Sequence, residues 1–250
     1  MPDDAREWTV SVVERLAEVP RDAWNACAAS TNPFVSYDFL SCLEDSGCVG
    51  PGTGWAARHV VVKTLDGAVL GCAPTYLKSH SMGEYVFDQG WAQAFERAGG
   101  HYYPKLLTAV PFTPATGPRL LVRGDLPANQ QSALKRQLAD TLAALTQSAG
   151  LSSAHVNFVE PDDAHALLEA GFLARAGIQY HWKNNEFESF DDFLETGLDM
   201  HKLDLRFLQN LLHYYYKQQL LCLLQNIPFR LKYLRLCLRF YLRVKESCLY

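Results

Sequence analysis

The sequence predicts an α+β domain built around a mixed central sheet with helices on its faces. Strand patterns and helix patterns neither alternate strictly, as in a doubly wound parallel sheet, nor form the long strand series of an all-β domain. Hydrophobic residues make up 48% of the 250 residues and charged residues 20%, a balance typical of a chain that buries a core.

The first part of the chain predicts one strand and two helices. Residues 8–13 alternate polar and apolar side chains as a strand does, and residues 21–29 are rich in Ala. Ser36 fits the N-cap of a second helix, Asp38 fits its first turn, and Gly47 fits its end.

A β-hairpin is predicted next. Residues 59–64 and 68–77 are strand-like segments on either side of the turn residues Asp66 and Gly67. Because Pro74 has no backbone N–H to donate to a neighbouring strand, we expect an edge or a bulge at that position.

The middle of the chain holds two short apolar segments and the clearest helix. Residues 106–110 and 118–122 are separated by the turn-forming stretch 111–117. Residues 129–150 carry a stripe of leucines at helical spacing and end in Gly.

The last predicted elements are a strand, a short helix and a closing strand region. Residues 154–159 are strand-like, and Asp162 and Asp163 are well placed at the start of a helix whose dipole favours anions. That helix covers residues 164–170, and residues 172–182 predict one or two strands.

The composition changes abruptly near residue 198. Residues 199–250 contain nine Lys and Arg against three Asp and Glu, no Gly and no Ala, whereas Gly and Ala are frequent before that point. We therefore expect a domain over residues 1–197 and an atypical Leu-, Tyr- and Arg-rich tail over residues 198–250, helical or disordered.

Charge, cysteine usage and hydropathy limit the classes of function. A net charge of −4 argues against DNA as a partner. The seven Cys form no CxxC pair and no His lies at zinc-finger spacing, so we expect reduced thiols, no disulfide framework and no metal. The acidic start lacks the apolar region of a secretory signal, and no run is long enough to span a membrane, so we expect a cytoplasmic protein without a transmembrane segment.

Several unusual stretches carry a family resemblance. They are the segments 32–40, 76–92, 102–106, 111–119, 179–182 and 190–193. Together they resemble the FemAB-like family of peptidoglycan biosynthesis and recognition proteins, which are related to the GNAT acyltransferases, over about residues 8–197. The resemblance implies a GNAT-like N-acyltransferase or aminoacyltransferase scaffold, usually built from two such halves.

The chain departs from the family pattern after residue 197. The family continues into a basic helix and a second acyltransferase half, which residues 198–250 do not match. We interpret this tail as out-of-frame or mis-spliced translation, which the two other reading frames of the DNA would test. The alternative is a genuine basic amphipathic helix for a membrane surface or a partner.

Candidate site residues gather between Lys78 and Arg119. Acyl transfer to an amine needs a group that takes the proton of the amine and donors for the developing oxyanion. We predict Asp88 and His181 as catalytic residues. The predicted substrate-binding residues are Lys78, His80, Glu84, Trp91, Tyr103, Lys105, Thr113, Thr116, Gly117 and Arg119.

Each of these residues also has a structural interpretation. Asp88 could instead cap the short helix that follows it, and Lys105 could be a solvated strand end. His80 is a lone imidazole, and His181 could pack in the core or at an edge. Arg119 could pair with a neighbouring acid in a Pro-rich turn instead of binding a phosphate or carboxylate.

The acyl donor stays open between aminoacyl-tRNA and acyl-CoA. The stretch before the long helix has one Gly, an acidic Asp125 and Pro127, which lacks an amide proton, so it is a poor pyrophosphate site. Two hypotheses follow. The chain is a FemAB-like acyltransferase that holds a small-molecule or peptide amine against residues 78–119, or a truncated, non-catalytic module that recognises a cell-wall or peptide ligand.

Overall fold

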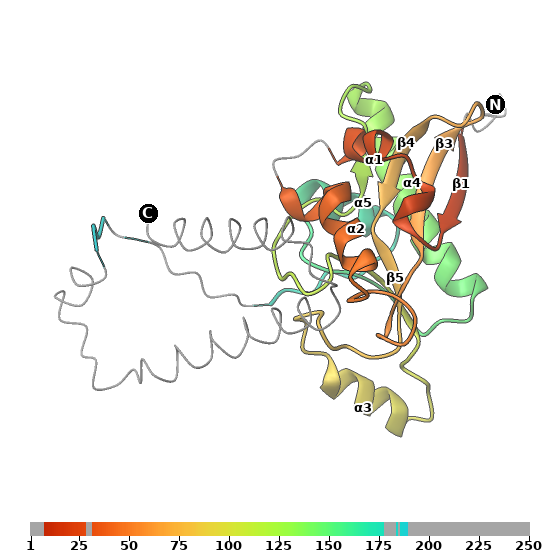
Figure 1. Cartoon of the computed structure of the whole chain (residues 1–250). Helices are drawn as coiled ribbons and strands as arrows, with labels where there is room; N and C mark the ends of the chain where they lie inside the picture. Colours follow the sequence, from red (N-terminus) through yellow and green to blue (C-terminus); the bar gives the residue numbers. More distant parts are fainter. Residues whose placement is uncertain (1–7, 29–31, 178–183, 185, 190–250) are drawn as a thin grey trace. The chain divides into compact units, whose positions relative to one another are not determined.

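The computed structural model describes residues 8–28, 32–177, 184 and 186–189 (Figure 1). The chain divides into the units Met1–Ala174 and Arg175–Tyr250, and every element below belongs to the first unit. The predicted tail, residues 198–250, lies outside the described residues, and the predicted boundary after residue 197 stays a prediction.

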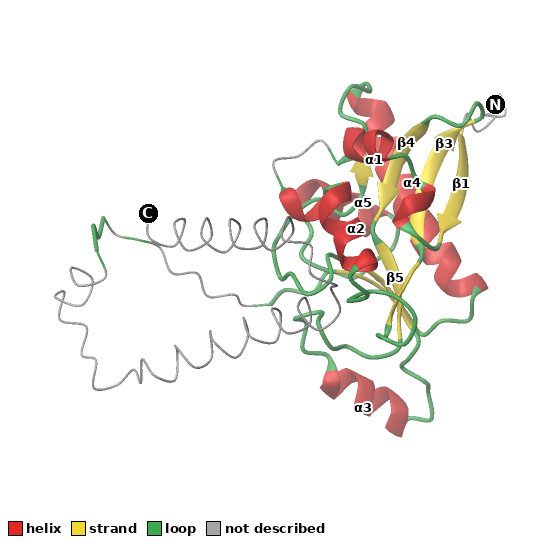
Figure 2. Ribbon diagram, in the orientation of Figure 1, coloured by secondary structure: helices red, strands yellow, loops and turns green. Residues whose placement is uncertain are grey.

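Strands and helices are both well represented and interspersed along the chain, which confirms the α+β class (Figure 2). The strands form two four-stranded sheets. The first sheet is antiparallel, with the order β1-β3-β4-β7. Its strands are β1 (Trp8–Val13), β3 (His59–Thr64), β4 (Val69–Ala73) and β7 (Leu121–Val122).

The second sheet has the order β2-β5-β6-β8 and is mixed, because β8 runs parallel to β6 while the other pairs are antiparallel. Its strands are β2 (Trp55–Ala57), β5 (Thr75–Lys78), β6 (Lys105–Thr108) and β8 (Ala154–Val156). Pro74 separates β4 from β5, so the interruption expected there is the point at which the chain leaves one sheet for the other.

Five α-helices accompany the sheets in the described part of the chain: α1 (Arg21–Cys27), α2 (Tyr37–Asp45), α3 (Gln89–Arg97), α4 (Ala128–Ser148) and α5 (Pro161–Glu169). Short 3-10 turns cover η1 (Leu16–Glu18) and η2 (Pro33–Val35). Ser36 caps α2 as predicted, because its hydroxyl accepts a hydrogen bond from the Phe39 N–H at 3.3 Å.

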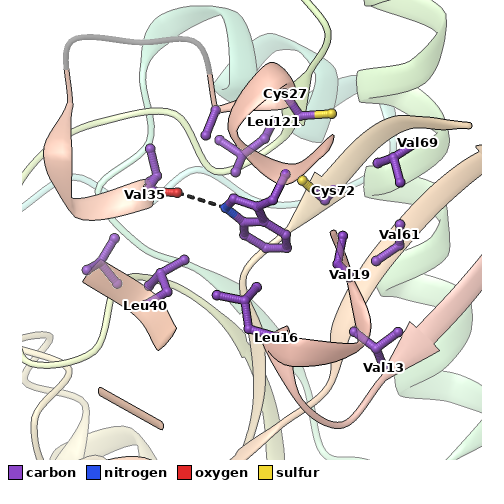
Figure 3. Close-up of a cluster of buried hydrophobic side chains, with 13 residues drawn as sticks. Val13, Leu16, Val19, Cys27, Val35, Leu40, Val61, Val69, Cys72 and Leu121 are labelled. Atoms are coloured by element: carbon purple, nitrogen blue, oxygen red, sulfur yellow. Dashed lines mark hydrogen bonds between the residues drawn. The ribbon is translucent and has the colours of Figure 1, made fainter. Parts of the chain in front are cut away.

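The two faces of the first sheet pack against different helices. Successive residues of β3 point to opposite faces: Val61 joins the core beneath α1 and α2, whereas Val60 and Val62 join the core beneath α4 and α5. Trp24 fills the first core and donates from its indole nitrogen to the Val35 carbonyl at 2.9 Å (Figure 3). The charged residues described below lie on strands of the second sheet.

Some predicted elements differ from the structure. β2 was not predicted, and β7 is shorter than the segment 118–122. Residues 172–177, the first part of the predicted closing strand region, form no strand. The second part, residues 178–182, lies outside the described residues. Short strands are set by their partners across the sheet more than by local pattern, which explains these misses.

Candidate functional site

A row of three large buried side chains crosses the second sheet. Lys78 on β5 lies directly opposite Trp55 on β2 and directly opposite Lys105 on β6. Opposed residues of neighbouring strands share one face, so the three side chains lie side by side. The Lys78 ammonium nitrogen is 3.5 Å from the centroid of the Trp55 ring. Two lysines in register repel each other, and this row therefore needs anions.

The segment 79–88, which connects β5 to α3, supplies the anions. The Lys105 Nζ donates to Glu84 Oε2 at 2.9 Å and to Asp88 Oδ2 at 2.5 Å. Lys78 donates to the Met82 carbonyl at 3.2 Å. All four charged side chains are buried, and the second oxygens, Glu84 Oε1 and Asp88 Oδ1, are buried without a hydrogen-bond partner. We call this set the lysine cluster: Lys78, Lys105, Glu84 and Asp88.

Three hydroxyl groups complete the surroundings of the lysine cluster. The Tyr102 hydroxyl donates to Asp88 Oδ2 at 2.8 Å, and Lys105 donates to Ser81 Oγ at 3.0 Å. Ser81 Oγ is 2.7 Å from the Tyr103 hydroxyl. Asp88 occupies the N-cap position of α3, but its side chain makes no capping bond and turns toward Tyr102 and Lys105 instead.

Burial and charge shift the pKa values of the lysine cluster. Burial lowers the pKa of Lys78 to about 7, and the nearby Lys105 acts in the same direction. Burial raises the pKa of Glu84 above its usual value, although Lys105 opposes this. For Asp88 the effect of burial is outweighed by hydrogen bonds, that from Lys105 first, and its pKa falls below the usual value. Asp88 is therefore ionised at neutral pH, while Lys78 exchanges its proton there.

His80 and Trp91 belong to the same stretch of chain but not to the lysine cluster. The His80 Nδ1 accepts from the Met82 N–H at 3.2 Å, so Nε2 is the nitrogen that donates to the Thr53 carbonyl, at 3.0 Å. Burial, followed by the charge of Lys78, lowers the pKa of this imidazole. Trp91 lies on α3 with 66% of its surface exposed.

The second predicted group, in the turn before β7, forms a separate arrangement. The buried Arg119 guanidinium donates to three backbone carbonyls: from Nε to Asn157 at 3.0 Å, from NH1 to Pro118 at 3.1 Å and from NH2 to Ala115 at 2.6 Å. Every nitrogen of this side chain therefore holds backbone in place, and burial lowers its pKa to about 10.

Thr113, Thr116 and Gly117 help to hold the turn that Arg119 organises. The Thr113 hydroxyl donates to the Pro111 carbonyl at 3.1 Å, and the Thr116 carbonyl accepts from the Asn32 side-chain amide at 3.3 Å. A Cβ at Gly117 would lie 2.0 Å from Asn32 Nδ2, so a larger residue here would displace the Asn32 side chain and its hydrogen bond to the Thr116 carbonyl.

The sequence predicted Asp163 only at the start of a helix. In the structure its carboxylate also contacts two other parts of the chain. Its Oδ2 accepts from the backbone N–H groups of Arg119 at 2.6 Å and Leu120 at 3.0 Å, while its Oδ1 lies 2.7 Å from Lys135 Nζ. It thus joins α5 to α4 and to the chain entering β7. We call Arg119 with Asp163 the arginine clamp.

The predicted site residues include all four members of the lysine cluster but omit three of its neighbours, Ser81, Trp55 and Tyr102. Ser81 was passed over because a loop serine carries no distinguishing signal. Trp55 was missed because its strand was not predicted, although an aromatic residue after the glycines of 50–54 was available as a clue. The predicted catalytic His181 lies outside the described residues.

The described residues show neither a metal site nor a membrane-spanning helix, and the start of α4 is occupied by internal contacts. Among the described residues, no group of three His, Cys, Asp or Glu side chains is placed to hold a metal ion. Within the same residues no helix is long and apolar enough to cross a bilayer. Before α4, Arg123 pairs with Asp125, and the Gln131 amide donates to the Leu126 carbonyl at 2.7 Å.

Comparisons with known proteins identify the family. The chain belongs to the FemAB-like family, described as acting in peptidoglycan biosynthesis or recognition, whose model matches residues 15–206. Among solved structures, an aminoglycoside antibiotic 6'-N-acetyltransferase from Acinetobacter baumannii is similar, with 12% identity and a TM-score of 0.42 over 71% of this chain and 98% of that chain. No curated protein matches the chain.

Proposed function

We propose that this protein is an N-acyltransferase that modifies an amine of a peptidoglycan precursor. Membership of the FemAB-like family sets the biological context. The observation that carries the chemical proposal is the lysine cluster, a buried set of acids and amines in which Glu84 Oε1 and Asp88 Oδ1 have no hydrogen-bond partner. Such unsatisfied acceptors are costly in a purely structural cluster and are typical of functional sites.

In the proposed reaction the acceptor amine attacks the carbonyl carbon of an activated acyl donor. The new C–N bond forms, the bond to the leaving group breaks, and the amine gives up a proton. Asp88 is the proposed proton acceptor. Its lowered pKa supports this role, because the carboxylate is ionised at neutral pH. His181 is the second proposed catalytic residue, on the basis of the sequence alone.

The substrate-binding residues divide into two groups in this proposal. Lys78, Glu84, Tyr103 and Lys105 surround the acceptor through the lysine cluster and its hydroxyl neighbours. Thr113, Thr116, Gly117 and Arg119 shape the turn behind it. His80 lies within the segment that leads into α3, and Trp91 lies on α3 itself. Arg119 acts here by holding backbone, since its nitrogens already donate to carbonyls.

The donor is proposed to be an aminoacyl-tRNA or another activated acyl group in preference to acyl-CoA. A CoA pyrophosphate would need free amides and positive charge at the start of the long helix. There Pro127 has no N–H, and Asp125 both neutralises Arg123 and repels phosphate.

The test is product formation by the full chain. A muropeptide with a free amine is incubated with aminoacyl-tRNA or with acyl-CoA, and the amide product is measured by mass spectrometry. We expect product with wild type and a rate at least about 100-fold lower with Asp88→Asn, because general-base catalysis contributes that much. Asp125→Asn, at a surface ion pair, is the matched control and should retain the wild-type rate. Absence of product with every donor would refute the proposal.

A non-catalytic recognition module is the second candidate. It is favoured by the engagement of Asp88 Oδ2 with both Lys105 and Tyr102, which ties this oxygen to the protein's own donors. In that case muropeptides stabilise the chain against heat while no donor yields a product. Stabilisation by a CoA thioester would instead favour the hypothesis that the protein is an enzyme.

A further inference from the structure

The segment 79–88 is held to the second sheet in an unusual way. Its only fully buried residues are the two acids Glu84 and Asp88, whereas its large apolar residues Met82 and Phe87 are 69% and 73% exposed. Segments that pack permanently on a sheet bury their apolar side chains. This one is held by the ion pairs of its two acids together with a few neutral hydrogen bonds, such as those from His80 to the Thr53 carbonyl and from the Phe112 N–H to the Gly83 carbonyl. A ligand that competes for the lysines therefore competes with the ion pairs of the segment.

The contacts between this segment and the lysines are incomplete. Glu84 and Asp88 each spend one oxygen on Lys105 and leave the other buried without a partner. Lys78 receives neither carboxylate as a hydrogen-bond partner and donates only to the Met82 carbonyl. Burying charges with imperfect pairing costs more than the pairing returns, so these contacts are well suited to exchange.

The backbone around Glu84 is also strained. Gly83 has φ 79° and Tyr85 has φ 56°, on either side of the acid that reaches Lys105. The left-handed region suits Gly, but a bulky residue such as Tyr pays to adopt it. Release of the segment would relieve the strain at Tyr85, which lowers the cost of moving Glu84 away.

We propose that Lys78 and Lys105 form an oxyanion-binding site that the segment 79–88 covers, with the carboxylates of Glu84 and Asp88 in the places that a ligand's anionic oxygens take. The ligand would be a dianion or a molecule with two anionic groups, such as a phosphate or a dicarboxylate. The reason is that two ammonium groups lie opposite each other on β5 and β6, and two negative charges would neutralise them. The Trp55 ring beside Lys78 forms one wall of this site.

Binding of the anion would have a consequence for Asp88. Once the ligand holds Lys105, Asp88 loses the hydrogen bond that does most to keep its pKa low. The displaced carboxylate then becomes a stronger base, which would favour its role as proton acceptor in the transfer reaction. This consequence rests on the proposed transferase function, whereas the anion site itself does not.

The test measures anion binding to the full chain without donor or acceptor. Inorganic phosphate and succinate are titrated at constant ionic strength, and binding is followed by calorimetry. The two titrations distinguish a phosphate from a carboxylate ligand. We expect the double variant Glu84→Gln/Asp88→Asn to bind at least one of them about tenfold more tightly than wild type, because the internal competitors are gone. Lys105→Met should bind neither.

A control variant separates local competition from overall charge. Asp22→Asn/Asp66→Asn removes two exposed acids and changes the net charge equally, and it should bind as wild type does. In wild type, saturating phosphate or succinate should speed amide hydrogen exchange across residues 79–88, a readout that needs no substitution.

Equal affinity of wild type and Glu84→Gln/Asp88→Asn would overturn the proposal. So would unchanged exchange of the segment in the presence of both anions. Because neither measurement involves acyl transfer, an inactive enzyme that binds anions would refute the transferase and leave the covered site standing. An active enzyme without anion binding would do the reverse.

Discussion

The lysine cluster and the arginine clamp are both buried and charged, yet they are satisfied to different degrees. All three guanidinium nitrogens of Arg119 donate to carbonyls, and Asp163 Oδ2 accepts from two backbone N–H groups. Asp163 Oδ1 makes no hydrogen bond but lies 2.7 Å from Lys135 Nζ, so each oxygen of this acid faces a donor or a cation. In the lysine cluster, Glu84 and Asp88 each keep a buried oxygen without one. A saturated network rigidifies a fold, whereas an unsaturated one leaves acceptors for a ligand. The pairing of both carboxylate oxygens with a donor or a cation, more than burial, therefore distinguishes the acid of the arginine clamp from the two acids of the lysine cluster.

The largest effect is expected in the arginine clamp. Arg119→Ala removes three hydrogen bonds that hold carbonyls of two chain segments, so we expect a loss of about 3 kcal/mol in the free energy of unfolding. Urea denaturation measures it. Arg123→Ala, at an exposed ion pair, is the control and should leave the midpoint unchanged. An Arg119→Ala protein as stable as wild type would contradict the structural role of the arginine clamp.

The next effect is local. Lys105→Met leaves Glu84 and Asp88 without their cation, so the segment 79–88 should swing into water. Because the segment can leave without unfolding the sheets, we expect a loss of only about 2 kcal/mol in global stability. Amide exchange of residues 79–88 should rise strongly, while that of β3 and α4 changes little. Uniform acceleration across the chain would mean that the lysine cluster is as structural as the clamp.

A pH profile isolates Lys78. Its pKa falls from 10.5 to about 7 on folding, so between these values the unfolded chain binds more protons and stability rises with pH. Lys78→Met removes this slope, and its stability relative to wild type should be greatest near pH 7 and shrink toward pH 9. Thermal unfolding at several pH values measures it, with Lys63→Met as the control. Parallel profiles of wild type and Lys78→Met would contradict the assignment.

The smallest effect concerns one hydroxyl. Tyr102→Phe removes a single hydrogen bond to Asp88 Oδ2, which should cost about 1 kcal/mol and raise the pKa of Asp88 toward its usual value. Chemical denaturation measures the first change, and NMR titration of the carboxyl carbon measures the second. An unchanged Asp88 titration would show that the Tyr102 hydroxyl does not help to lower the pKa of this acid.

Local signals in the sequence predicted much of the fold. The cap at Ser36, the hairpin turn at Gly67 and the long leucine-striped helix all appear in the structure close to their predicted places. Each depends on neighbours within a few residues, where turn and capping chemistry acts. Short strands such as β2 and β7 could not be predicted, because their pairing partners are distant in sequence.

The sequence by itself determined the α+β class, the family resemblance and the stretch in which charged residues gather. Only the tertiary structure decided that Lys78 and Lys105 stand opposite each other, that Glu84 and Asp88 face them, and that Arg119 is spent on backbone carbonyls. The reason is that strand register is a long-range property: a shift of one residue in the pairing of β5 with β6 would turn one lysine to the opposite face.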